Sequence, residues 1–308
     1  MAESPVQLLL PPLRQWAQDL PADITLALAR ADTGRTESWL MSLPASAALS
    51  RLGEGDLALD EVRGYRWLRA DPAWLRADIN GAWLVAIGPM LAASEQDAAA
   101  FRSELAPLFV DAGIRLQMPH PERWYLRLPQ DGSLPRFSTP AEALGADLFK
   151  HRPEGDGAPG WRQLDGEAQV ILHNHPRNGE RATRGLMPIN GLWLWGDAGL
   201  PDVLHLAIPT IHSGDPMLRG MARLAMLEPA TRPDAFPTGA SGLYDLRDVP
   251  AQRLHQHWLQ PSLQAMKSEG GYMDWLIEDG DSYRLASAQR WRFWRRQWQP
   301  GATGGAAE

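Results

Sequence analysis

Short apolar runs that end at proline or glycine alternate along this chain with longer amphipathic segments, and this alternation constrains the fold more than any other feature. The run at 6–10 stops at Pro11, and the run at 82–87 stops at Gly88. Both have the length of buried strands. Segment 94–111 has the apolar spacing of a helix that packs on a core, and Ser94 with Asp97 resembles a capping box at its start. Strands alternating with helices predict an α/β fold, in which a mixed sheet is covered by helices.

The remaining elements are predicted by the same rules. The run at 203–208 is almost continuously apolar, which is typical of a central strand. We expect further strands at 24–28, 124–128, 190–195 and 243–246, a hairpin that joins 272–277 to 283–285, and helices at 13–20, 140–150, 161–174, 215–227 and 250–268.

Composition excludes several classes of protein. With 308 residues, 44% of them hydrophobic, the chain can bury a full core without disulfides or structural metals. It has no cysteine, which excludes disulfides, thiolate metal sites and a cysteine nucleophile. No signal-peptide pattern and no bilayer-length apolar run is present, so we expect a cytoplasmic protein without membrane contact. The net charge of −7 makes nucleic acid an unlikely partner, because binding it depends on a positive field.

Motifs of the common catalytic classes are missing. The chain has no Gly-x-Ser-x-Gly, no phosphate-binding Gly-x-x-x-x-Gly-Lys and no Gly-x-Gly-x-x-Gly. His173 and His175 are two residues apart in a predicted helix, so their imidazoles point away from each other. His255 and His257 have the same spacing. We therefore predict no metal site, no catalytic residue of these classes and no cofactor.

A cluster of arginines beside His175 is the strongest local signal. Arg177, Arg181 and Arg184 have spacings of four and three, so one helical face would display all of them. The planar guanidinium suits phosphate and carboxylate, because it donates paired hydrogen bonds. The residues alone leave two interpretations open: a site for a small anion, or an amphipathic connector whose arginines are solvated.

The residues that follow extend the same candidate site. Asn190 lies at the mouth of a predicted strand, where an amide can bind a hydroxyl group. Trp193 and Trp195 share one face of that strand, and Gly196 allows a tight turn with exposed backbone N–H groups. The complete predicted ligand-binding set is His175, Arg177, Asn178, Arg181, Arg184, Asn190, Trp193, Trp195 and Gly196.

The C-terminal segment 290–298 mixes arginines with three tryptophans. Two interpretations apply to it as well. Either Trp291 and Trp294 pack while the arginines extend into solvent, or the segment binds single-stranded nucleic acid or anionic lipid. A protein partner that docks on these tryptophans is a further possibility. Residues 300–308 form a Gly/Ala tail that we expect to be disordered.

The pattern His-Pro-x-Asn from His175, with Arg181, Gly185 and then Asn-x-x-Trp-x-Trp-Gly from Asn190, resembles archaeal-type cofactor-independent phosphoglycerate mutases. Over nearly its whole length the chain is similar to the bacterial regulatory protein RpfE family, through residues 123–125, 172–178, 190–196 and 292–296. This resemblance implies a degenerate mutase-like architecture. It places parts of the core at 1–60 and 201–299, and an insert-like ligand-binding region at 61–200.

The same resemblance implies two metal ions, a phosphoryl-carrying serine, and Asp/His ligands near both ends of the chain. The Asp-Gly expected after the first strand is replaced by Pro11-Pro12, and no Asp-x-x-x-His cluster follows near the end. In such phosphoryl transfer the metals stabilise both the attacking and the leaving oxygen. We therefore expect a regulatory or metabolite-sensing protein that binds a small phosphorylated or carboxylated metabolite. The alternatives are an active mutase or phosphatase, and a protein-interaction module with a Trp-rich surface.

Overall fold

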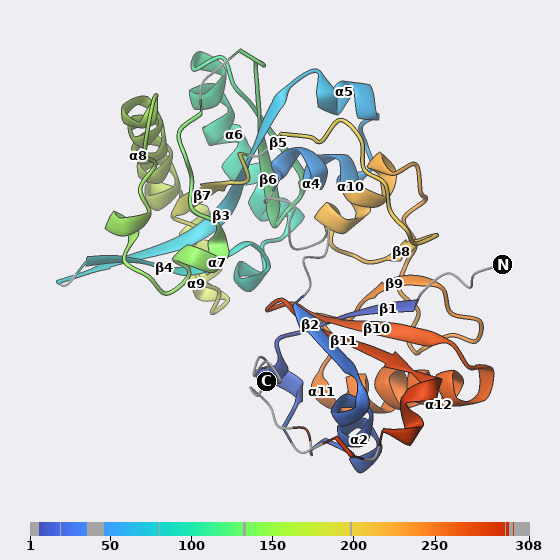
Figure 1. The fold of residues 1–308 in the computed structure, drawn as a ribbon. Coiled ribbons are helices and arrows are strands. Elements are labelled where there is room, and N and C mark those ends of the chain that lie inside the picture. The colour runs from blue at the N-terminus through green and yellow to red at the C-terminus, as the bar shows by residue number, and fades with distance from the viewer. Residues whose placement is uncertain are drawn as a thin grey trace. The chain divides into compact units, whose positions relative to one another are not determined.

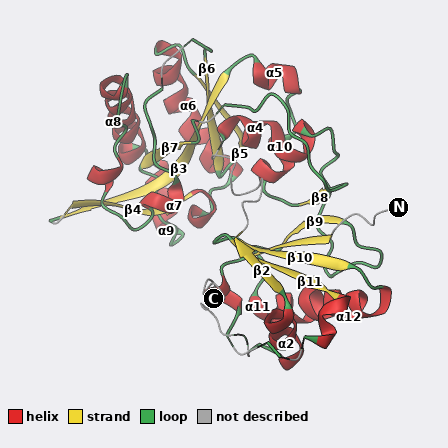
Figure 2. Cartoon of the chain, in the orientation of Figure 1, coloured by secondary structure: helices red, strands yellow, loops and turns green. Residues whose placement is uncertain are grey.

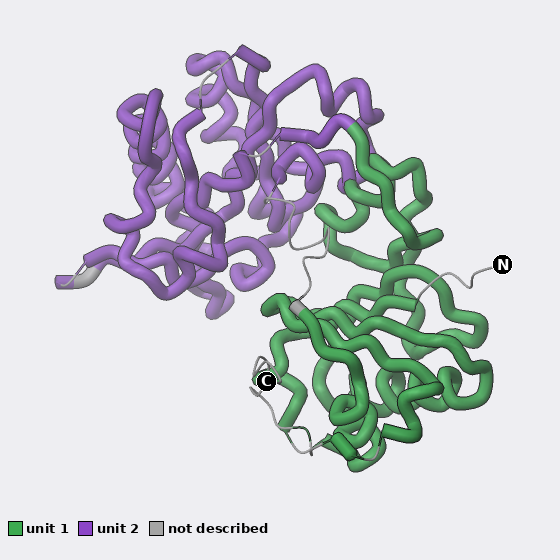
Figure 3. Tube along the Cα trace, in the orientation of Figure 1, with its two compact units in different colours: residues 1–43, 203–308 green, residues 44–202 purple. Residues whose placement is uncertain are grey.

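A computed structural model describes residues 6–18, 20–35, 46–79, 81–131, 134–197, 199–292, 294, 295 and 298. The chain folds into two compact units, which Figure 3 colours separately. Unit 1 consists of Met1–Leu43 together with Val203–Glu308, and unit 2 of Pro44–Asp202. Unit 2 is thus inserted into unit 1. Residues 44–60 belong to the inserted unit rather than to the N-terminal part of the core. The predicted tail at 300–308 lies outside the described residues.

Unit 1 is built on a mixed sheet with the strand order β2-β11-β10-β1-β9-β8. Strand β1 pairs in parallel with β10 on one side and β9 on the other, and β9 pairs in parallel with β8. Helices α2, α11 and α12 lie on one face of this sheet (Figure 1). Its strands are β1 (Val6–Leu10), β2 (Asp32–Arg35), β8 (Ile211–His212), β9 (Gly242–Asp245), β10 (Tyr272–Ile277) and β11 (Asp281–Ala286). Its helices are α1 (Leu13–Trp16), α2 (Ala22–Arg30), α10 (Pro216–Leu224), α11 (Ala251–Leu254), the π-helix η3 (His255–Leu259), α12 (Gln260–Glu269) and the 3₁₀ helix η4 (Ser287–Trp291).

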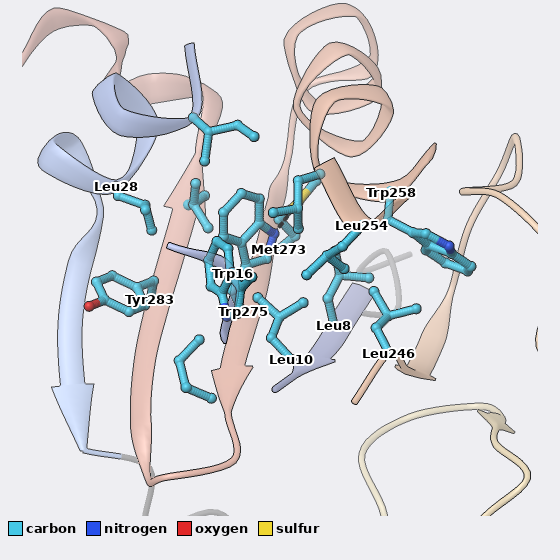
Figure 4. Packing of buried hydrophobic residues seen from close by; sticks show 14 of the residues in the cluster. Leu8, Leu10, Trp16, Leu28, Leu246, Leu254, Trp258, Met273, Trp275 and Tyr283 are labelled. Carbon is cyan, nitrogen blue, oxygen red and sulfur yellow. Dashed lines mark hydrogen bonds between the residues drawn. The ribbon is translucent and has the colours of Figure 1, made fainter. Parts of the chain in front are cut away.

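The core of unit 1 lies between the sheet and these helices, and tryptophans dominate it (Figure 4). Trp16 and Trp275 are buried edge to face with ring centroids 6.4 Å apart. The ring centroids of Trp258 and Tyr244 lie 5.5 Å apart. Each buried indole removes about 150–250 Å² from water, so a few of them supply much of this core.

Unit 2 contains a second sheet, in which every strand pairing is antiparallel. The long strand β3 pairs with β4, β6 and β7, and β6 pairs with β5. Its strands are β3 (Arg66–Asp78), β4 (Gly81–Ile87), β5 (Arg115–His120), β6 (Arg123–Leu128) and β7 (Gly191–Trp195). Its helices are α4 (Ala47–Glu54), α5 (Leu59–Arg63), η1 (Gly88–Leu91), α6 (Glu95–Asp111), α7 (Pro140–Ala143), η2 (Leu148–His151), α8 (Ala158–Asn174) and α9 (Arg177–Thr183). Figure 2 shows the helices and strands of both units by colour.

The mixed α/β class is confirmed, as are the predicted hairpin and the helices near 94–111, 161–174, 215–227 and 250–268. The prediction for 24–28 is wrong, because this run belongs to helix α2, in which Ile24 and Leu28 are buried one turn apart. The prediction for 203–208 is also wrong, since these residues form no strand. The helices expected at 13–20 and 140–150 are shorter, and end at Trp16 and Ala143.

Candidate functional site

The arginines of the predicted anion site converge on one carboxylate inside unit 2. Asp97 lies in the first turn of α6, where Ser94 and Asp97 form the predicted capping box. Arg177 Nε donates to Oδ1 of Asp97 at 2.6 Å, and Arg181 Nη1 donates to Oδ2 at 2.6 Å. Arg181 also donates to the carbonyls of Met187 and Leu91, at 3.0 and 2.5 Å. Each of the three nitrogens of its guanidinium therefore donates to the protein.

This geometry corrects the prediction of three arginines on one solvent-facing surface. The Arg181 side chain is 0% exposed, because α9 packs it against the start of α6. Burial alone would raise the pKa of Asp97, but hydrogen bonds from Ser94 and Arg177 and the charge of Arg181 hold it below the usual value. The carboxylate thus stays charged between its arginines. Arg184 is the exposed member of the three.

The predicted polar residues around these arginines bind backbone groups. His175 Nδ1 accepts from the N–H of Arg177 at 3.0 Å, and the imidazole packs 4.8 Å from the ring of Phe101. Asn178 donates to the carbonyls of Leu172 and Ile189 and accepts from the N–H of Ile189. Asn178 therefore links the C-terminal end of α8 by hydrogen bonds to the segment that precedes β7.

Asn190, which directly precedes β7, also binds backbone groups. Its amide exchanges two hydrogen bonds of 2.8 Å with the backbone N–H and carbonyl of Leu75 in β3. We predicted that the Asn190 amide binds a hydroxyl group of a ligand, which would require an amide that is not already bonded to the protein. Within the described residues, both ends of the Asn190 amide are taken up by the neighbouring strand.

The two tryptophans of β7 and the glycine after it are also held by the protein. Trp193 Nε1 donates to the carbonyl of Ser138 at 3.0 Å, and Trp195 Nε1 donates to Asp71 at 2.8 Å. Gly196 has a φ of +79°, and a Cβ there would lie 3.0 Å from the backbone N of Ala47. Gly196 is buried, so the expectation of an open glycine turn with exposed N–H groups is corrected. Only glycine fits this close approach to α4.

Asp71 belongs to a buried ionic cluster that the sequence did not indicate. Arg69 makes paired bonds to Asp71 at 2.7 and 2.8 Å, and its guanidinium lies 4.9 Å from the ring centre of Tyr125. Tyr125 donates to Glu54 at 2.7 Å, and burial raises the pKa of this phenol well above 10. Arg123 pairs with Glu54 as well. Such balanced, hydrogen-bonded charge fixes one packing arrangement of β3, β6 and α4.

A different polar cluster lies at the carboxyl ends of the parallel strands in unit 1. Ser213 follows β8, Asp245 ends β9 and Glu278 follows β10. Carboxyl ends of parallel strands share one edge of a sheet, where α/β proteins commonly bind ligands. A cavity of about 530 Å³ opens there, which we call the sheet-edge cleft. Its lining consists of Gly214, Asp215, Thr231, Arg232, Asp245, Arg247, Asp248 and Glu278.

Arg247 is the centre of the sheet-edge cleft. It donates from Nε to Asp245 at 2.8 Å, and from Nη2 to Asp215 and Asp245 at 3.0 Å each. Its Nη1 lies 3.8 Å from Glu278 and makes no hydrogen bond within the described residues. The Arg247 side chain is 26% exposed and lines the cleft.

The carboxylate of Asp245 is fixed by its neighbours. The Ser213 hydroxyl, in a residue only 1% exposed, donates to it at 2.7 Å. Burial would raise the pKa of Asp245, but hydrogen bonds and charge from Arg247, together with the Ser213 bond, hold it below the usual value. A carboxylate with a depressed pKa is a weak base and does not donate a proton near neutral pH. The arrangement therefore suits binding better than acid–base catalysis.

The two metal ions implied by the mutase resemblance do not fit this cleft. Among the described residues, no group of three or more His, Cys, Asp or Glu side chains is placed to hold a metal ion. Asp215, Asp245 and Glu278 instead surround the guanidinium of Arg247. A cation added among them would be repelled by that fixed positive charge. The strand β1, whose end would supply the missing Asp-Gly, leads into Pro11 and Pro12.

Sequence reasoning missed the sheet-edge cleft although it predicted the elements around it. Strand 243–246 and the helix start at Asp215 were both expected, and they place Asp245 and Asp215 at element ends. Polar residues directly after apolar strands are the signal that would have found this site. Ser213 and Asp245 are 32 positions apart in the sequence, so their pairing could not be seen from local patterns.

Comparisons with known proteins give partial similarities. No family model matches the chain. A 2,3-bisphosphoglycerate-independent phosphoglycerate mutase of Methanothrix thermoacetophila is 34% identical over 64 residues, which is 21% of this chain and 16% of the relative's own length. The solved cofactor-independent phosphoglycerate mutase from Thermoplasma acidophilum superimposes with a TM-score of 0.41 at 17% identity, covering 92% of this chain and 89% of that one. The PH0037 protein from Pyrococcus horikoshii superimposes with a TM-score of 0.43 at 12% identity, covering 93% of this chain and 87% of that one.

The relationship to the RpfE family stays a prediction after these comparisons. None of the described helices is both long enough and apolar enough to cross a membrane.

Proposed function

We propose that this protein is a regulatory or sensing protein that binds a small carboxylated or phosphorylated metabolite of the phosphoglycerate type, without metal-dependent catalysis. One observation carries the proposal. At the carboxyl ends of the parallel strands, the guanidinium of Arg247 lies among the carboxylates that line the cleft, and its Nη1 makes no hydrogen bond within the described residues. A guanidinium in this position can pair with a ligand carboxylate or phosphate.

The charges of the cleft favour one kind of ligand within that class. Two arginines and four carboxylates line it, so a strongly charged anion meets repulsion as well as attraction. Hydroxyl groups would be donors to Asp248 and Glu278, whose side chains are 73% and 46% exposed. A small hydroxy acid with a single negative group therefore fits better than a multiply charged phosphate.

Calorimetric titration with glycerate and with 3-phosphoglycerate tests this assignment. We expect Arg247→Gln to weaken binding about ten- to a hundred-fold, because a charge-assisted hydrogen bond contributes about 1.5–3 kcal/mol. Arg253→Gln is the matched control, since Arg253 is 53% exposed, pairs with Asp234 and lies outside the cleft. Equal affinities of Arg247→Gln and the wild type, with circular dichroism unchanged, would reject the site.

The rival function is an active mutase or phosphatase that uses displaced metal ligands. Conversion of 3-phosphoglycerate to 2-phosphoglycerate, assayed with added Mn²⁺, separates the two. We expect no turnover above background. Turnover on the ordinary enzymatic scale of about 1–1000 per second would overturn the non-catalytic proposal.

A second candidate function is supported by a separate observation. Trp291 and Trp294 are 63% and 71% exposed near the end of the chain, and Arg290 lies over the ring of Trp291 at 5.0 Å. Exposed aromatics beside arginine are typical of protein-binding surfaces. If this segment docks a partner, Trp291→Ser should abolish co-purification of that partner while the melting temperature stays within about 1 °C of the wild type.

A further inference from the structure

A second cavity in unit 1 lies between α2, α12 and η4, and we call it the helix-face cavity. Its volume is about 130 Å³. Residues of the core form its apolar floor, chiefly Leu263, Met266 and Leu285. Ala286, which also lines it, pairs with Tyr272 at the first position of β10. The cavity therefore lies at the amino ends of the parallel strands, at the opposite end from the sheet-edge cleft.

The charge around the helix-face cavity is opposite in sign to that of the whole protein. Arg30, Lys267 and Arg290 line it, with Asp23 as its one acidic residue. The chain as a whole carries −7. Within the described residues, neither Arg30 nor Lys267 forms an ion pair. A cationic rim on an acidic protein attracts small anions locally, because nearby charges dominate the potential at a short distance.

One donor in this rim has no acceptor. The Nε of Arg30 is buried from solvent and makes no hydrogen bond within the described residues. Burying an N–H without a partner costs about 1–3 kcal/mol, so such groups are uncommon and call for an explanation. Attraction to the carboxyl end of α2 explains a basic side chain at Arg30. It does not explain why the Arg30 guanidinium, which lines the cavity, makes no hydrogen bond within the described residues. Because Nε is out of contact with solvent, a ligand in the cavity would reach Arg30 at its terminal Nη groups.

We propose that the helix-face cavity binds a small organic carboxylate whose apolar body is about the size of a benzene ring. The body would lie on Leu263, Met266 and Leu285, and the carboxylate would accept from Arg30 with support from Lys267. The size follows from the volume, since an apolar cavity of about 150 Å³ holds benzene. A carboxylate fits because it supplies two acceptor oxygens to a planar donor group.

This site is independent of the sheet-edge cleft and adds a ligand class to the proposed function. The sheet-edge cleft is polar and favours a hydroxylated acid. The helix-face cavity has an apolar floor and no carboxylate other than Asp23, so hydroxyl groups would lose their water there without gaining partners.

Titration of the full-length protein with benzoate, monitored by saturation-transfer NMR and calorimetry, tests the proposal. We expect benzoate to bind at least ten-fold more tightly than benzamide, which has the same shape and no charge. Arg30→Gln should weaken benzoate binding at least ten-fold, and Ala27→Leu should abolish it by filling the cavity. Arg253→Gln is the control and should bind benzoate as the wild type does.

The site would be overturned by benzamide binding as well as benzoate, by Arg30→Gln or Ala27→Leu binding benzoate normally, or by benzoate failing to bind the wild type. If Arg30→Gln does not fold, the exposed Lys267→Gln replaces it, with a loss of about three-fold expected and an unchanged affinity counting against the site. Arg247→Gln should leave benzoate binding intact. If Arg247→Gln weakens benzoate binding instead, benzoate binds in the sheet-edge cleft and the helix-face site is rejected. This result would be independent of whether the proposed function is correct.

Discussion

The two arginine clusters of this protein have similar chemistry but differ in how deeply the arginine is buried. In unit 2, Arg181 lies at 0% exposure between Asp97 and two backbone carbonyls. In unit 1, Arg247 holds Asp245 and Asp215 but remains 26% exposed, with Nη1 free of hydrogen bonds within the described residues. Both lie beside a helix N-terminus, at Asp97 in α6 and at Asp215 in α10. Both side chains make three hydrogen bonds, but every guanidinium nitrogen of Arg181 is bonded and buried, whereas Nη1 of Arg247 makes none within the described residues. Burial and a nitrogen without a hydrogen bond, rather than residue type, separate a structural arginine from one that can bind a ligand.

The largest expected effect is on the buried cluster. Arg181→Ala leaves the Asp97 carboxylate without its fully buried partner, and breaking a buried ion pair in this way costs about 3–5 kcal/mol of unfolding free energy. Arg247→Ala should cost less, about 1–3 kcal/mol, because Arg247 is partly exposed and the buried Asp245 keeps its bond from Ser213. Urea denaturation followed by tryptophan fluorescence measures both.

Arg184→Ala is the control in the same helical segment, and we expect it to change stability by less than about 0.5 kcal/mol, because Arg184 is exposed. A loss for Arg181→Ala that is no larger than that for Arg184→Ala would contradict the structural role and return Arg181 to the candidate ligand site.

The next effect concerns Asn190. Replacing it with alanine removes two hydrogen bonds of 2.8 Å and leaves the Leu75 backbone groups of β3 unpaired. We expect a loss of about 1–3 kcal/mol. Asn174→Ala is the matched control, since the Asn174 amide makes an exposed bond to the carbonyl of Val170. An equally small effect at both positions would mean that Asn190 is available for another partner.

The smallest effect depends on pH and concerns Asp165 in α8. This residue lies on the inward stripe between Trp161 and Ala168, without a charged or hydrogen-bonding partner in the described part of the chain. Burial raises the pKa of Asp165 to about 7. An unfolded aspartate has a pKa near 3.9, so the folded state binds the extra proton between about pH 4 and 7, and stability falls as the pH rises through that window.

Asp165→Asn should therefore stabilise the protein at pH 8 and have little effect at pH 4. The side chain is partly exposed, and solvent reduces the expected gain to about 1–2 kcal/mol. Urea denaturation at both pH values measures the difference, with the exposed Glu167→Gln on the same helix as control. A stabilisation that is equal at pH 4 and pH 8 would contradict a titrating Asp165.

Local patterns in the sequence predicted local structure well. The Ser94–Asp97 capping box, the hairpin around 278–281 and strand 190–195 needed only neighbouring residues, and the structure has all three. The strand predicted at 24–28 was wrong because five residues are too few to distinguish a strand from one face of a helix. The wider span of α2 has the helical spacing of Ile24 and Leu28.

Long-range pairing was beyond the same reasoning. The spacing of Arg177, Arg181 and Arg184 placed them on one face of a helical turn, but the partner of two of them, Asp97, lies 80 or more residues away. Without that partner, a buried arginine cannot be distinguished from a solvated one. The sheet-edge cleft could not be predicted for the same reason, because its residues come from the ends of three separate strands.

The insertion of unit 2 between the two segments of unit 1 has a consequence for how the protein is made. Strand β1 is synthesised first, yet its two neighbours are Gly242–Asp245 and Met273–Ile277. Unit 2 is complete at Asp202, with a core of its own, before either neighbour leaves the ribosome. Translation at about 5–20 residues per second leaves the apolar β1 unpaired for many seconds. That interval is when this chain is most exposed to aggregation, and when a chaperone that holds its first residues would have the greatest effect on yield.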